Sequence, residues 1–363
     1  MKKIILISVN YFFIVCIYFC IASTIFAQES QPVNLQTTAN QTNAESLQNI
    51  INKISLWLVR IDTIGGFEKV GNEFANDGTS TGFLLDKEGY ILTSAFNFLH
   101  EPTSILIRFH NGTKKVARRI AVDHNRMLTL LKVDGLDANF LPPEKPEFRK
   151  LNDIKIAEPV VVIAVALAAN EPNITRGIIS GKNRIWKKAI QTDAAIGPNN
   201  YGGVIVGFDG KVFAIAAPLS MTSNELAAGS DTYDAGVGLA IPFEDINKNI
   251  LDKLKKGKDL HPAFIGTAFK ENQIFVGEPV LNAVMPKSPA EKAGLKKDDK
   301  IIKINNDKIE TALEYEMNIK SRYAGEILEL TYLRNGKENK VSIETIIPPP
   351  PKTKTKSHSL KIE

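Results

Sequence analysis

The chain has 363 residues, with 45 Lys and Arg against 40 Asp and Glu, and its formal net charge is +5. At roughly 100–200 residues per domain, this length predicts two or three domains, and so small a positive excess gives no reason to expect a nucleic-acid partner. The five histidines are scattered and form no HExxH-type pair. The sequence therefore predicts no metal site and no cofactor.

The first 27 residues differ sharply from the rest of the chain. Lys2 and Lys3 precede an apolar run from Ile4 to Phe26, and Ala27 stands before polar residues. This layout predicts a signal peptide (1–27) and a protein exported to the periplasm or cell envelope. The run is also long enough to span a bilayer as an uncleaved anchor. Cleavage removes two lysines, which lowers the net charge from +5 to +3, and both cysteines, which leaves no disulfide.

Two polar segments flank the expected folded region. Residues 28–43 are rich in Gln, Asn, Thr and Ser, which predicts a flexible leader. A short helix around Ala44–Lys53 then leads into the fold, so that leader and lead-in helix together occupy about 28–50. At the other end, four prolines followed by alternating Lys and Thr predict a disordered tail over 348–363.

Short apolar segments separated by Gly, Asn, Asp and Pro dominate the chain from Leu56 onward. The pairs Asn111-Gly112, Asp209-Gly210 and Asn335-Gly336 each lie between two such segments. Asn-Gly and Asp-Gly supply the positive φ that tight β-hairpins need. Many short strands at this spacing favour β-barrels or sandwiches, so the predicted fold class is mainly β.

The pattern changes to helical spacing over Phe243–Lys256, where apolar residues recur every three or four positions. We therefore predict a β domain over 51–247, a linker helix over 248–260 and a small α+β module over 261–347.

That module contains a helix whose start and end are both indicated by capping residues. Ser288 suits the N-cap, Pro289 the first helical position, Glu291 a capping box and Gly294 the C-terminal end. With the strand that follows it, this order resembles the PDZ domain of exported bacterial proteases. The resemblance implies a site that binds peptides.

Two further segments of the module support this resemblance. Phe264-Ile265-Gly266-Thr267 resembles the carboxylate-binding loop, and the helix Thr311–Tyr323 resembles the helix that lines the groove, with Leu313 and Met317 as groove residues. Successive amides freed by a glycine can hold a terminal carboxylate while the peptide adds as a strand to the sheet edge. The alternative is a module that only packs against its neighbour.

The β domain resembles the trypsin-like double β-barrel of the HtrA (DegP-like) serine proteases. Four landmarks occur in the family's order: Thr81–Asp86 with Gly89–Thr93, Asp123–Val133, Gln191–Ile196 and Gly236–Pro242. A double β-barrel followed by a PDZ domain is therefore the expected fold.

The same resemblance locates the family's catalytic triad at positions that hold other residues. Phe96 stands at the histidine position, Met127 at the aspartate position and Tyr201 at the serine position. The mechanism needs a hydroxyl to attack, an imidazole to take its proton and a carboxylate to orient the imidazole. Phe and Met can neither accept nor donate the proton, and a phenol with a pKa near about 10 is a poor nucleophile at neutral pH. Asn199 and Asn200 match the family's oxyanion turn.

No replacement triad is visible: Ser180 and Asp123 match other positions of the family, and His100, four residues past Phe96, would point elsewhere. We expect Phe96, Met127 and Tyr201 to meet as an apolar cluster between the two barrels.

The sequence therefore predicts that the protein is not an enzyme but a pseudoprotease. It would act as a chaperone, adaptor or regulator by binding C-terminal or extended peptides, or unfolded segments, of exported proteins. The alternatives are a serine endopeptidase-family enzyme with residual activity at an unrecognised site, or a structural subunit of an active HtrA paralogue. Either a homo-oligomer or a hetero-oligomer with such a paralogue fits this family.

Overall fold

The computed structural model describes residues 35–65, 69–70, 73–74, 78–98, 101–136, 142, 144–219, 236–270 and 277–350. The predicted signal peptide, His100 and all but the first residues of the predicted tail therefore lie outside the described residues. The chain divides into two units, residues 1–49 and 50–363. Within the described ranges, no helix is both long and apolar enough to cross a membrane.

Helix α2 (Leu35–Ser55) is longer than the helix predicted around Ala44–Lys53. The sequence contains neither Gly nor Pro between Leu35 and Ser55, so no residue breaks the helix on the N-terminal side of Ala44. The prediction of a flexible leader over 28–43 is therefore wrong from Leu35 onward. Ile51 and Ile54 at the C-terminal end of α2 are buried and lead into the first strand.

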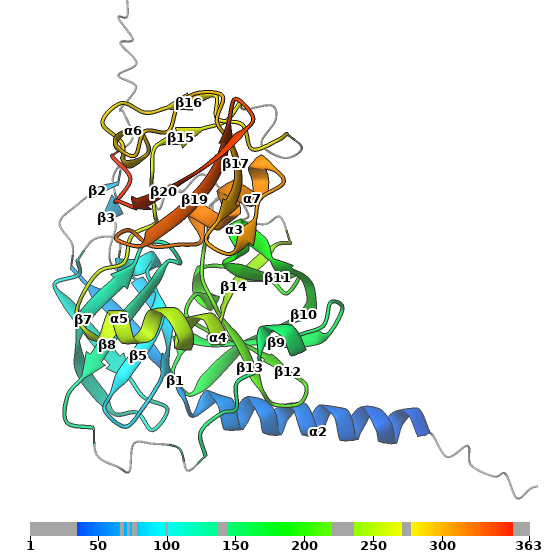
Figure 1. The fold of residues 1–363 in the computed structure, drawn as a ribbon. Helices are drawn as coiled ribbons and strands as arrows, with labels where there is room; N and C mark the ends of the chain where they lie inside the picture. The colour runs from blue at the N-terminus through cyan, green and yellow to red at the C-terminus, as the bar shows by residue number, and fades with distance from the viewer. Residues whose placement is uncertain are drawn as a thin grey trace, which may run out of the picture. The chain divides into compact units, whose positions relative to one another are not determined.

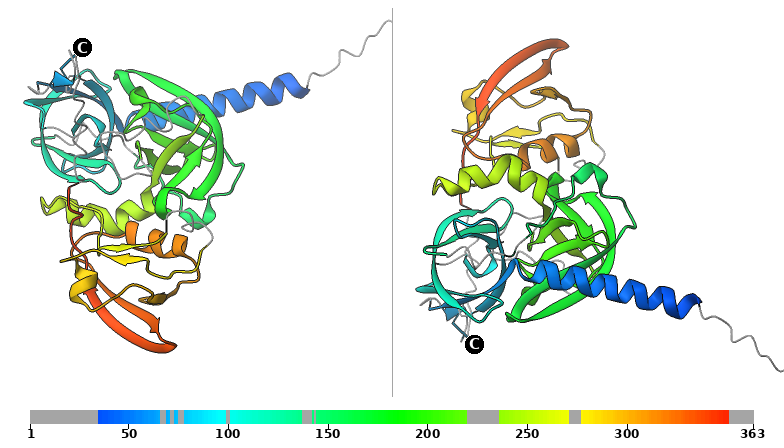
Figure 2. Two further views of the ribbon diagram at one scale, coloured as in Figure 1. Left: turned by 90° about the horizontal axis from the view of Figure 1, so that it is seen from above. Right: turned by 90° about the horizontal axis from the view of Figure 1, so that it is seen from below.

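Six antiparallel strands close the first barrel in the order β1-β4-β5-β8-β7-β6. The predicted Asn111-Gly112 hairpin joins β6 to β7, with Gly112 at φ 80°. The left view of Figure 2 shows these strands closing a ring. The strands are β1 (Leu58–Ile64), β4 (Gly78–Leu84), β5 (Tyr90–Ser94), β6 (Ser104–Arg108), β7 (Lys114–Asp123) and β8 (Leu128–Val133), while β2 (Lys69–Val70) and β3 (Glu73–Phe74) pair separately.

The second barrel has the order β10-β11-β14-β13-β12-β9. The predicted Asp209-Gly210 hairpin joins β12 to β13. Inward-facing side chains of the strands fill the barrel with aliphatic residues, among them Val160, Val162 and Ile190. The strands are β9 (Pro159–Ala168), β10 (Glu171–Asn183), β11 (Ala189–Thr192), β12 (Val204–Gly207), β13 (Val212–Ala216) and β14 (Gly238–Pro242).

The predicted helix over Phe243–Lys256 is confirmed as three consecutive helical segments, α4 (Phe243–Asp245), the π-helix η7 (Ile246–Ile250) and α5 (Leu251–Lys255). Phe243 is fully buried, and its ring centroid lies 5.2 Å from that of Phe83 and 4.7 Å from that of Phe148. This aromatic packing holds the start of the linker against Phe83 of the first barrel. Figure 1 shows α5 lying beside β7.

The C-terminal module contains a four-stranded sheet in the order β18-β17-β19-β20, a two-stranded sheet β15-β16 and two helices. Ser288 caps α6 by accepting a hydrogen bond from the Glu291 amide, as predicted. The third predicted hairpin joins β19 to β20, with Asn335 and Gly336 both at positive φ. The elements are β15 (Thr267–Ala268), β16 (Ala283–Val284), α6 (Pro289–Lys292), β17 (Lys300–Ile304), β18 (Asp307–Lys308), α7 (Ala312–Lys320), β19 (Ile327–Arg334) and β20 (Lys337–Glu344).

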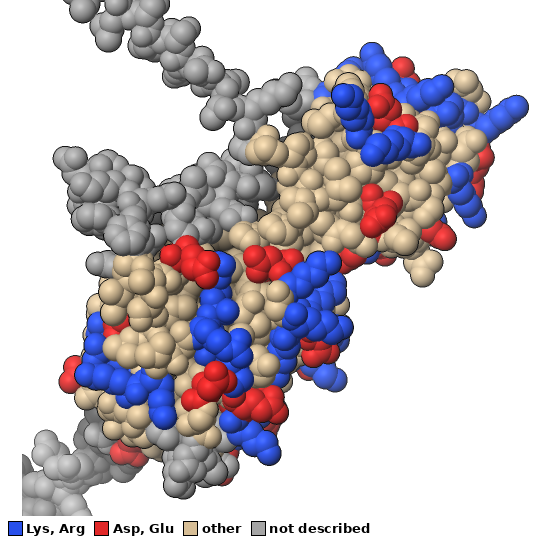
Figure 3. Space-filling model, turned by 90° about the vertical axis from the view of Figure 1, so that its left-hand side faces the viewer, with Lys and Arg blue, Asp and Glu red and all other residues tan. Residues whose placement is uncertain are grey.

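Charged side chains of both signs lie among uncharged residues on the surface. On the face shown in Figure 3, Lys and Arg side chains lie among Asp and Glu. On the first barrel, Asp134 pairs with Arg118 and Lys132, and Glu101 pairs with Arg119. That face therefore presents no extended field of one sign.

Candidate functional site

Phe96 and Tyr201 come from different barrels and meet at the junction between them. Phe96 begins the short helix η1 (Phe96–Phe98) after β5, and Tyr201 follows the short helix η4 (Pro198–Asn200). Their ring centroids lie 5.2 Å apart at an interplanar angle of 60°. Tyr201 is buried, whereas Phe96 is 38 % exposed. The two residues at the positions matched to histidine and serine are thus in direct ring contact.

Met127 lies in the adjacent turn between β7 and β8. Its carbonyl accepts a hydrogen bond from the Ala95 amide at 2.8 Å, and its side chain is buried. The Asp123 carboxylate accepts from the amides of Asn125 and Arg126, and the chain then reaches Met127 at φ 55°. All three predicted positions therefore belong to one region, which is what the alignment with the family requires.

Gly202 is required by the close approach of the two barrels. The Tyr201 carbonyl accepts from the Thr81 amide at 3.1 Å, and Gly202 follows at φ 80°. A Cβ on Gly202 would lie 1.8 Å from the Thr81 carbonyl oxygen. Only glycine fits both this backbone conformation and this contact.

The turn predicted to resemble an oxyanion turn has a different form from the one expected. Asn199 and Asn200 belong to η4, and neither has positive φ. The Asn200 amide donates to the Gly197 carbonyl at 2.8 Å, and the Tyr201 amide donates to the Pro198 carbonyl at 3.3 Å. The Tyr201 amide is therefore already hydrogen-bonded within the turn instead of pointing at a ligand.

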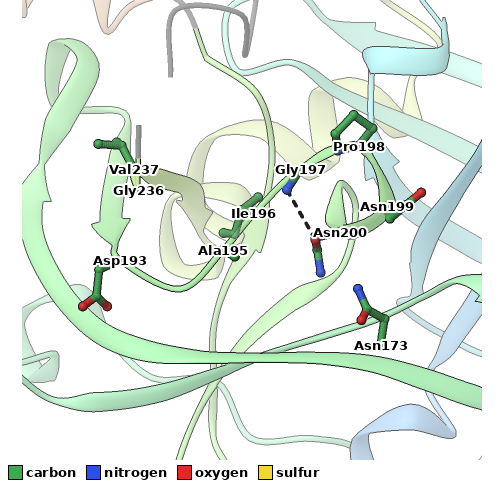
Figure 4. A pocket seen from close by; sticks show the side chains of 10 residues that line it. All are labelled: Asn173, Asp193, Ala195, Ile196, Gly197, Pro198, Asn199, Asn200, Gly236 and Val237. Atoms are coloured by element: carbon green, nitrogen blue, oxygen red, sulfur yellow. Dashed lines mark hydrogen bonds between the residues drawn. The ribbon is translucent and has the colours of Figure 1, made fainter. Parts of the chain in front are cut away.

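A pocket of about 430 Å³ lies beside this turn, lined by Asn173 of β10, Asp193, residues 195–200 and Gly236-Val237. The Asn200 side-chain oxygen accepts from the Gly197 amide at 3.3 Å, while its buried amide nitrogen has no partner among the described residues. Figure 4 shows the Asn173 and Asn200 side chains pointing toward each other. The Asp193 carboxylate accepts from the Ile178 amide at 2.7 Å. The pocket thus offers amide groups and one carboxylate.

Two other residues considered as candidates for chemistry, Ser180 and Asp123, lie within the described ranges. Ser180 lies within β10, and Asp123 is fully buried beside the C-terminal module. Over the ranges that the structure describes, no three His, Cys, Asp or Glu residues cluster in a way that would hold a metal ion.

The loop Phe264–Thr267 has free amides at a positive-φ glycine. Phe264 exchanges both backbone hydrogen bonds with Ile346, and the carbonyls of Ile265 and Gly266 accept from Ala290 and Met285. The amides of Ile265 and Gly266 donate to no acceptor in the described part of the chain. Gly266 has φ 87°, and a Cβ there would lie 2.2 Å from the Ser288 Cβ. Two consecutive free amides form a backbone site suited to an anion.

Helix α7 presents a buried face and a half-buried face. Ala312, Tyr315 and Ile319 are buried, whereas the predicted groove residues Leu313 and Met317 are half-buried. No pattern in the sequence indicates a role for Tyr315. Its hydroxyl lies 2.6 Å from the Thr267 hydroxyl, and its ring lies 4.9 Å from that of Phe269.

A buried polar network, formed by Asp123, Asn125, Arg126, Lys188 and Tyr323, joins both barrels to the C-terminal module. The Tyr323 hydroxyl donates to the Asp123 carboxylate at 2.6 Å and accepts from the Arg126 guanidinium at 2.5 Å. Burial raises the pKa of Asp123 and is also the main reason that the pKa of Tyr323 lies well above its usual value. Two hundred residues separate Asp123 from Tyr323, so no local sequence signal predicts their contact.

Lys188 extends the network from the second barrel. Its ammonium donates to the Asn125 carbonyl and side-chain oxygens, both at 3.0 Å, and the Asn125 side chain donates to the Arg322 carbonyl. Burial lowers the pKa of Lys188 to about 7. Nearby, the Lys320 ammonium of α7 lies 4.0 Å from the centre of the Trp186 ring. The network thus contains a group that titrates near neutral pH.

Comparison with known families matches the chain to two domains. Residues 80–215 match the model of a trypsin-like peptidase domain, and residues 263–345 match the model of a PDZ domain. The chain is 28 % identical over 305 residues to the serine protease Do-like HtrA of Bacillus subtilis, covering 76 % of this chain and 65 % of the relative. It is 27 % identical over 274 residues to the probable periplasmic serine endoprotease DegP-like of Chlamydia muridarum, covering 71 % and 52 %. The chain therefore spans about half to two thirds of these relatives.

Solved structures share the fold. The HtrA-type protease AlgW with a tripeptide matches with a TM-score of 0.64 and 22 % identity, covering 84 % of this chain and 98 % of that one. A serine endoprotease from Yersinia pestis matches with a TM-score of 0.60 and 22 % identity, covering 83 % and 98 %. At these identities the likeness shows the fold alone, which agrees with the predicted double β-barrel and α+β module.

Proposed function

Because the chain is a homologue of the HtrA and DegP-like serine proteases, with a trypsin-like peptidase domain and a PDZ domain, we propose that it is a pseudoprotease that binds peptides through the PDZ domain. The observation that carries the proposal is the ring contact of Phe96 and Tyr201 at the junction of the barrels. It supports the assignment of these residues to the histidine and serine positions of the triad.

The chemistry of this region supports the loss of activity. A phenylalanine ring takes no proton from a nucleophile, and Met127 offers no carboxylate to orient a base. The Tyr201 amide, which would be one donor to a developing oxyanion, is bonded to the Pro198 carbonyl. On this proposal the region lacks a base and an orienting carboxylate, and one of its candidate oxyanion donors is already hydrogen-bonded.

We expect purified protein to hydrolyse casein no faster than a buffer blank and to resist labelling by a fluorophosphonate probe, because Tyr201 and Phe96 stand at the positions matched to the serine and its base. The measurement is a fluorescent-casein assay with mass spectrometry of the probe-treated chain, alongside the Bacillus subtilis relative as an active control. Labelling of any serine would contradict the proposal. If Ser180 were labelled, loss of the label in Ser180→Ala would identify an unrecognised active site.

The free amides at Gly266 support the peptide-binding part of the proposal. A terminal carboxylate accepts from successive backbone amides while the peptide extends along a strand edge, and β15 has one edge paired with β16. The solved AlgW structures carry a tripeptide or a decapeptide, and we propose the same class of ligand for this chain. The ligands would be C-terminal peptides of exported proteins, because the DegP-like relatives are named periplasmic.

Replacing Gly266 by alanine should weaken binding of a free-carboxylate peptide by about tenfold or more, because a Cβ at φ 87° clashes with Ser288 and displaces the two amides. Gly325→Ala is the matched control. Gly325 also has φ 87°, but nothing lies within 4 Å of its Cβ position, so this variant bears the backbone strain without the clash. Calorimetric titration of both variants tests the proposal, and equal affinities would argue against the loop as the site.

A second role remains compatible with the same fold: a structural subunit that assembles with itself or with an active HtrA paralogue. Pull-down of the tagged full chain from its native envelope separates this role from peptide binding. Recovery of a paralogue by the Gly266→Ala variant at the wild-type level would favour assembly through another surface.

A further inference from the structure

The proposed peptide site has a floor made by a strand and a helix in contact. Thr267 begins β15, directly after the free amides, and Tyr315 lies in the middle of α7. Their hydroxyl oxygens lie 2.6 Å apart, and the Tyr315 ring packs edge-on against Phe269. Tyr315 is 1 % exposed. The space between β15 and α7 is therefore filled at this level by a tyrosine ring.

Thr267 lies close to where the C-terminal residue of a bound peptide would be. Thr267 and Phe269 both contact Tyr315, so their side chains lie on the side of this segment that faces α7. Thr267 is only half-buried, so its outer side is open. A carboxylate at the amides of Ile265 and Gly266 would bring the ligand's last side chain close to Thr267, because its Cβ is only two bonds from the carboxylate carbon and Thr267 directly follows these amides.

The depth available to that side chain is small. The Tyr315 hydroxyl lies on the inner side of Thr267 and is hydrogen-bonded to the Thr267 hydroxyl. The Tyr315 ring, which packs against Phe269, lies deeper still. A branched or aromatic terminal side chain would have to displace this ring from a close-packed core, which costs free energy. In the Thr267–Tyr315 hydrogen bond one of the two hydroxyls is the donor. The other hydroxyl can therefore donate its hydrogen to a third group, such as a ligand atom.

We propose that the Thr267–Tyr315 pair selects ligands whose C-terminal residue is small, namely Gly, Ala or Ser, and excludes Leu and Phe. The inference rests on the proposed peptide-binding function and specifies its ligand class. Tyr315 acts as a specificity-determining residue, since it limits the depth of the site from below, and the spare hydroxyl hydrogen favours a Ser side-chain oxygen over the methyl group of Ala.

The test uses the full chain and a fluorescent peptide series that differs only in the last residue, Ala, Ser, Leu or Phe, each with a free carboxylate or a C-terminal amide. Wild-type protein should bind the Ala and Ser peptides about tenfold or more tightly than the Leu and Phe peptides, which is the discrimination expected from a size-limited pocket. Tyr315→Leu replaces the ring with a shorter side chain and so deepens the site, which should reduce that ratio several-fold. Tyr315→Phe keeps the ring, so it should retain the size preference. Thr267→Val removes the half-buried hydroxyl and should lose the preference for Ser over Ala.

The outcomes separate the two proposals. Equal binding of the Ala and Leu peptides by wild-type protein, or an unchanged ratio in Tyr315→Leu, contradicts the size selection and leaves peptide binding intact. If the amidated peptides bind as well as the acids, or if no peptide binds, the proposed function itself fails and this inference fails with it. Should Tyr315→Leu not fold, as judged by thermal denaturation, Thr267→Ala deepens the site from the strand side and must reduce the same ratio.

Discussion

Asp123→Ala should lower the free energy of unfolding by about 3 to 5 kcal/mol, the cost of removing one partner from a buried ionic group. The substitution leaves three donors without their acceptor: the Tyr323 hydroxyl and the amides of Asn125 and Arg126. It also leaves the buried Arg126 guanidinium without the nearby carboxylate. Few single substitutions remove so many buried hydrogen bonds at once.

Tryptophan fluorescence gives a direct readout of this prediction. The chain has two tryptophans, and Trp57→Phe leaves Trp186, which is 9 % exposed and lies under Lys320 of α7. In that background, Asp123→Ala should shift the urea unfolding midpoint down and the Trp186 emission to the red, because the PDZ domain detaches more easily.

Two variants in the same Trp57→Phe background control this experiment. Asp134→Ala removes an exposed aspartate that pairs with Arg118 and Lys132, and should leave the unfolding midpoint nearly unchanged. Tyr323→Phe removes the hydroxyl alone and should cost about 1 to 2 kcal/mol. If Asp123→Ala behaves like Asp134→Ala, the buried network does not hold the PDZ domain on the barrels.

The parts of the fold that follow from local sequence were predictable. The Asn-Gly and Asp-Gly turns fix three hairpins, and the helical spacing after Phe243 fixes the linker helix, because both signals depend on neighbouring residues only. The contact of Phe96 with Tyr201 followed from the family motifs around them, Ser94-Ala95 before Phe96 and Gly202-Gly203 after Tyr201, and Gly202 is required where Tyr201 meets Thr81.

The α3 turn (Arg184–Lys187) shows why other parts were not predictable. Ile185, Trp186 and Lys187 all have positive φ, a conformation that a β-branched or aromatic residue adopts only when tertiary contacts impose it. Trp186 packs under Lys320, which is far away in sequence. Lys188 and Tyr323 escaped prediction for the same reason, since their partners come from other domains.

Between pH 7 and 9, the free energy of unfolding should rise by about 1.4 kcal/mol per pH unit through Lys188 alone. The folded protein holds the pKa of Lys188 at about 7, below its ordinary value of 10.5. In this window the unfolded chain therefore binds one proton that the folded chain does not. Stability increases with pH wherever the unfolded state binds more protons. Below pH 7 both states are charged, and burial of that charge destabilises the fold by a constant amount.

Lys188→Met should flatten this pH dependence. Methionine has no charge to desolvate, and it also escapes repulsion from Arg126 and Lys320, which disfavour a second cation at this place. The variant leaves two oxygens of Asn125 without a donor, so its stability at pH 9 should lie below that of the wild type, whereas the difference should shrink or reverse at pH 7.

Urea unfolding at pH 7, 8 and 9 measures the effect, with Lys187→Met as the matched control, because Lys187 is exposed. The window ends at pH 9 because the unfolded chain begins to lose tyrosine protons above it, while burial keeps Tyr315 and Tyr323 protonated in the folded protein, and this effect has the opposite sign. Equal slopes for wild type and Lys188→Met would mean that Lys188 keeps its proton in the fold. With equal slopes, the barrel–PDZ junction would hold a permanent buried cation, and the attachment of the PDZ domain would not respond to pH near neutrality.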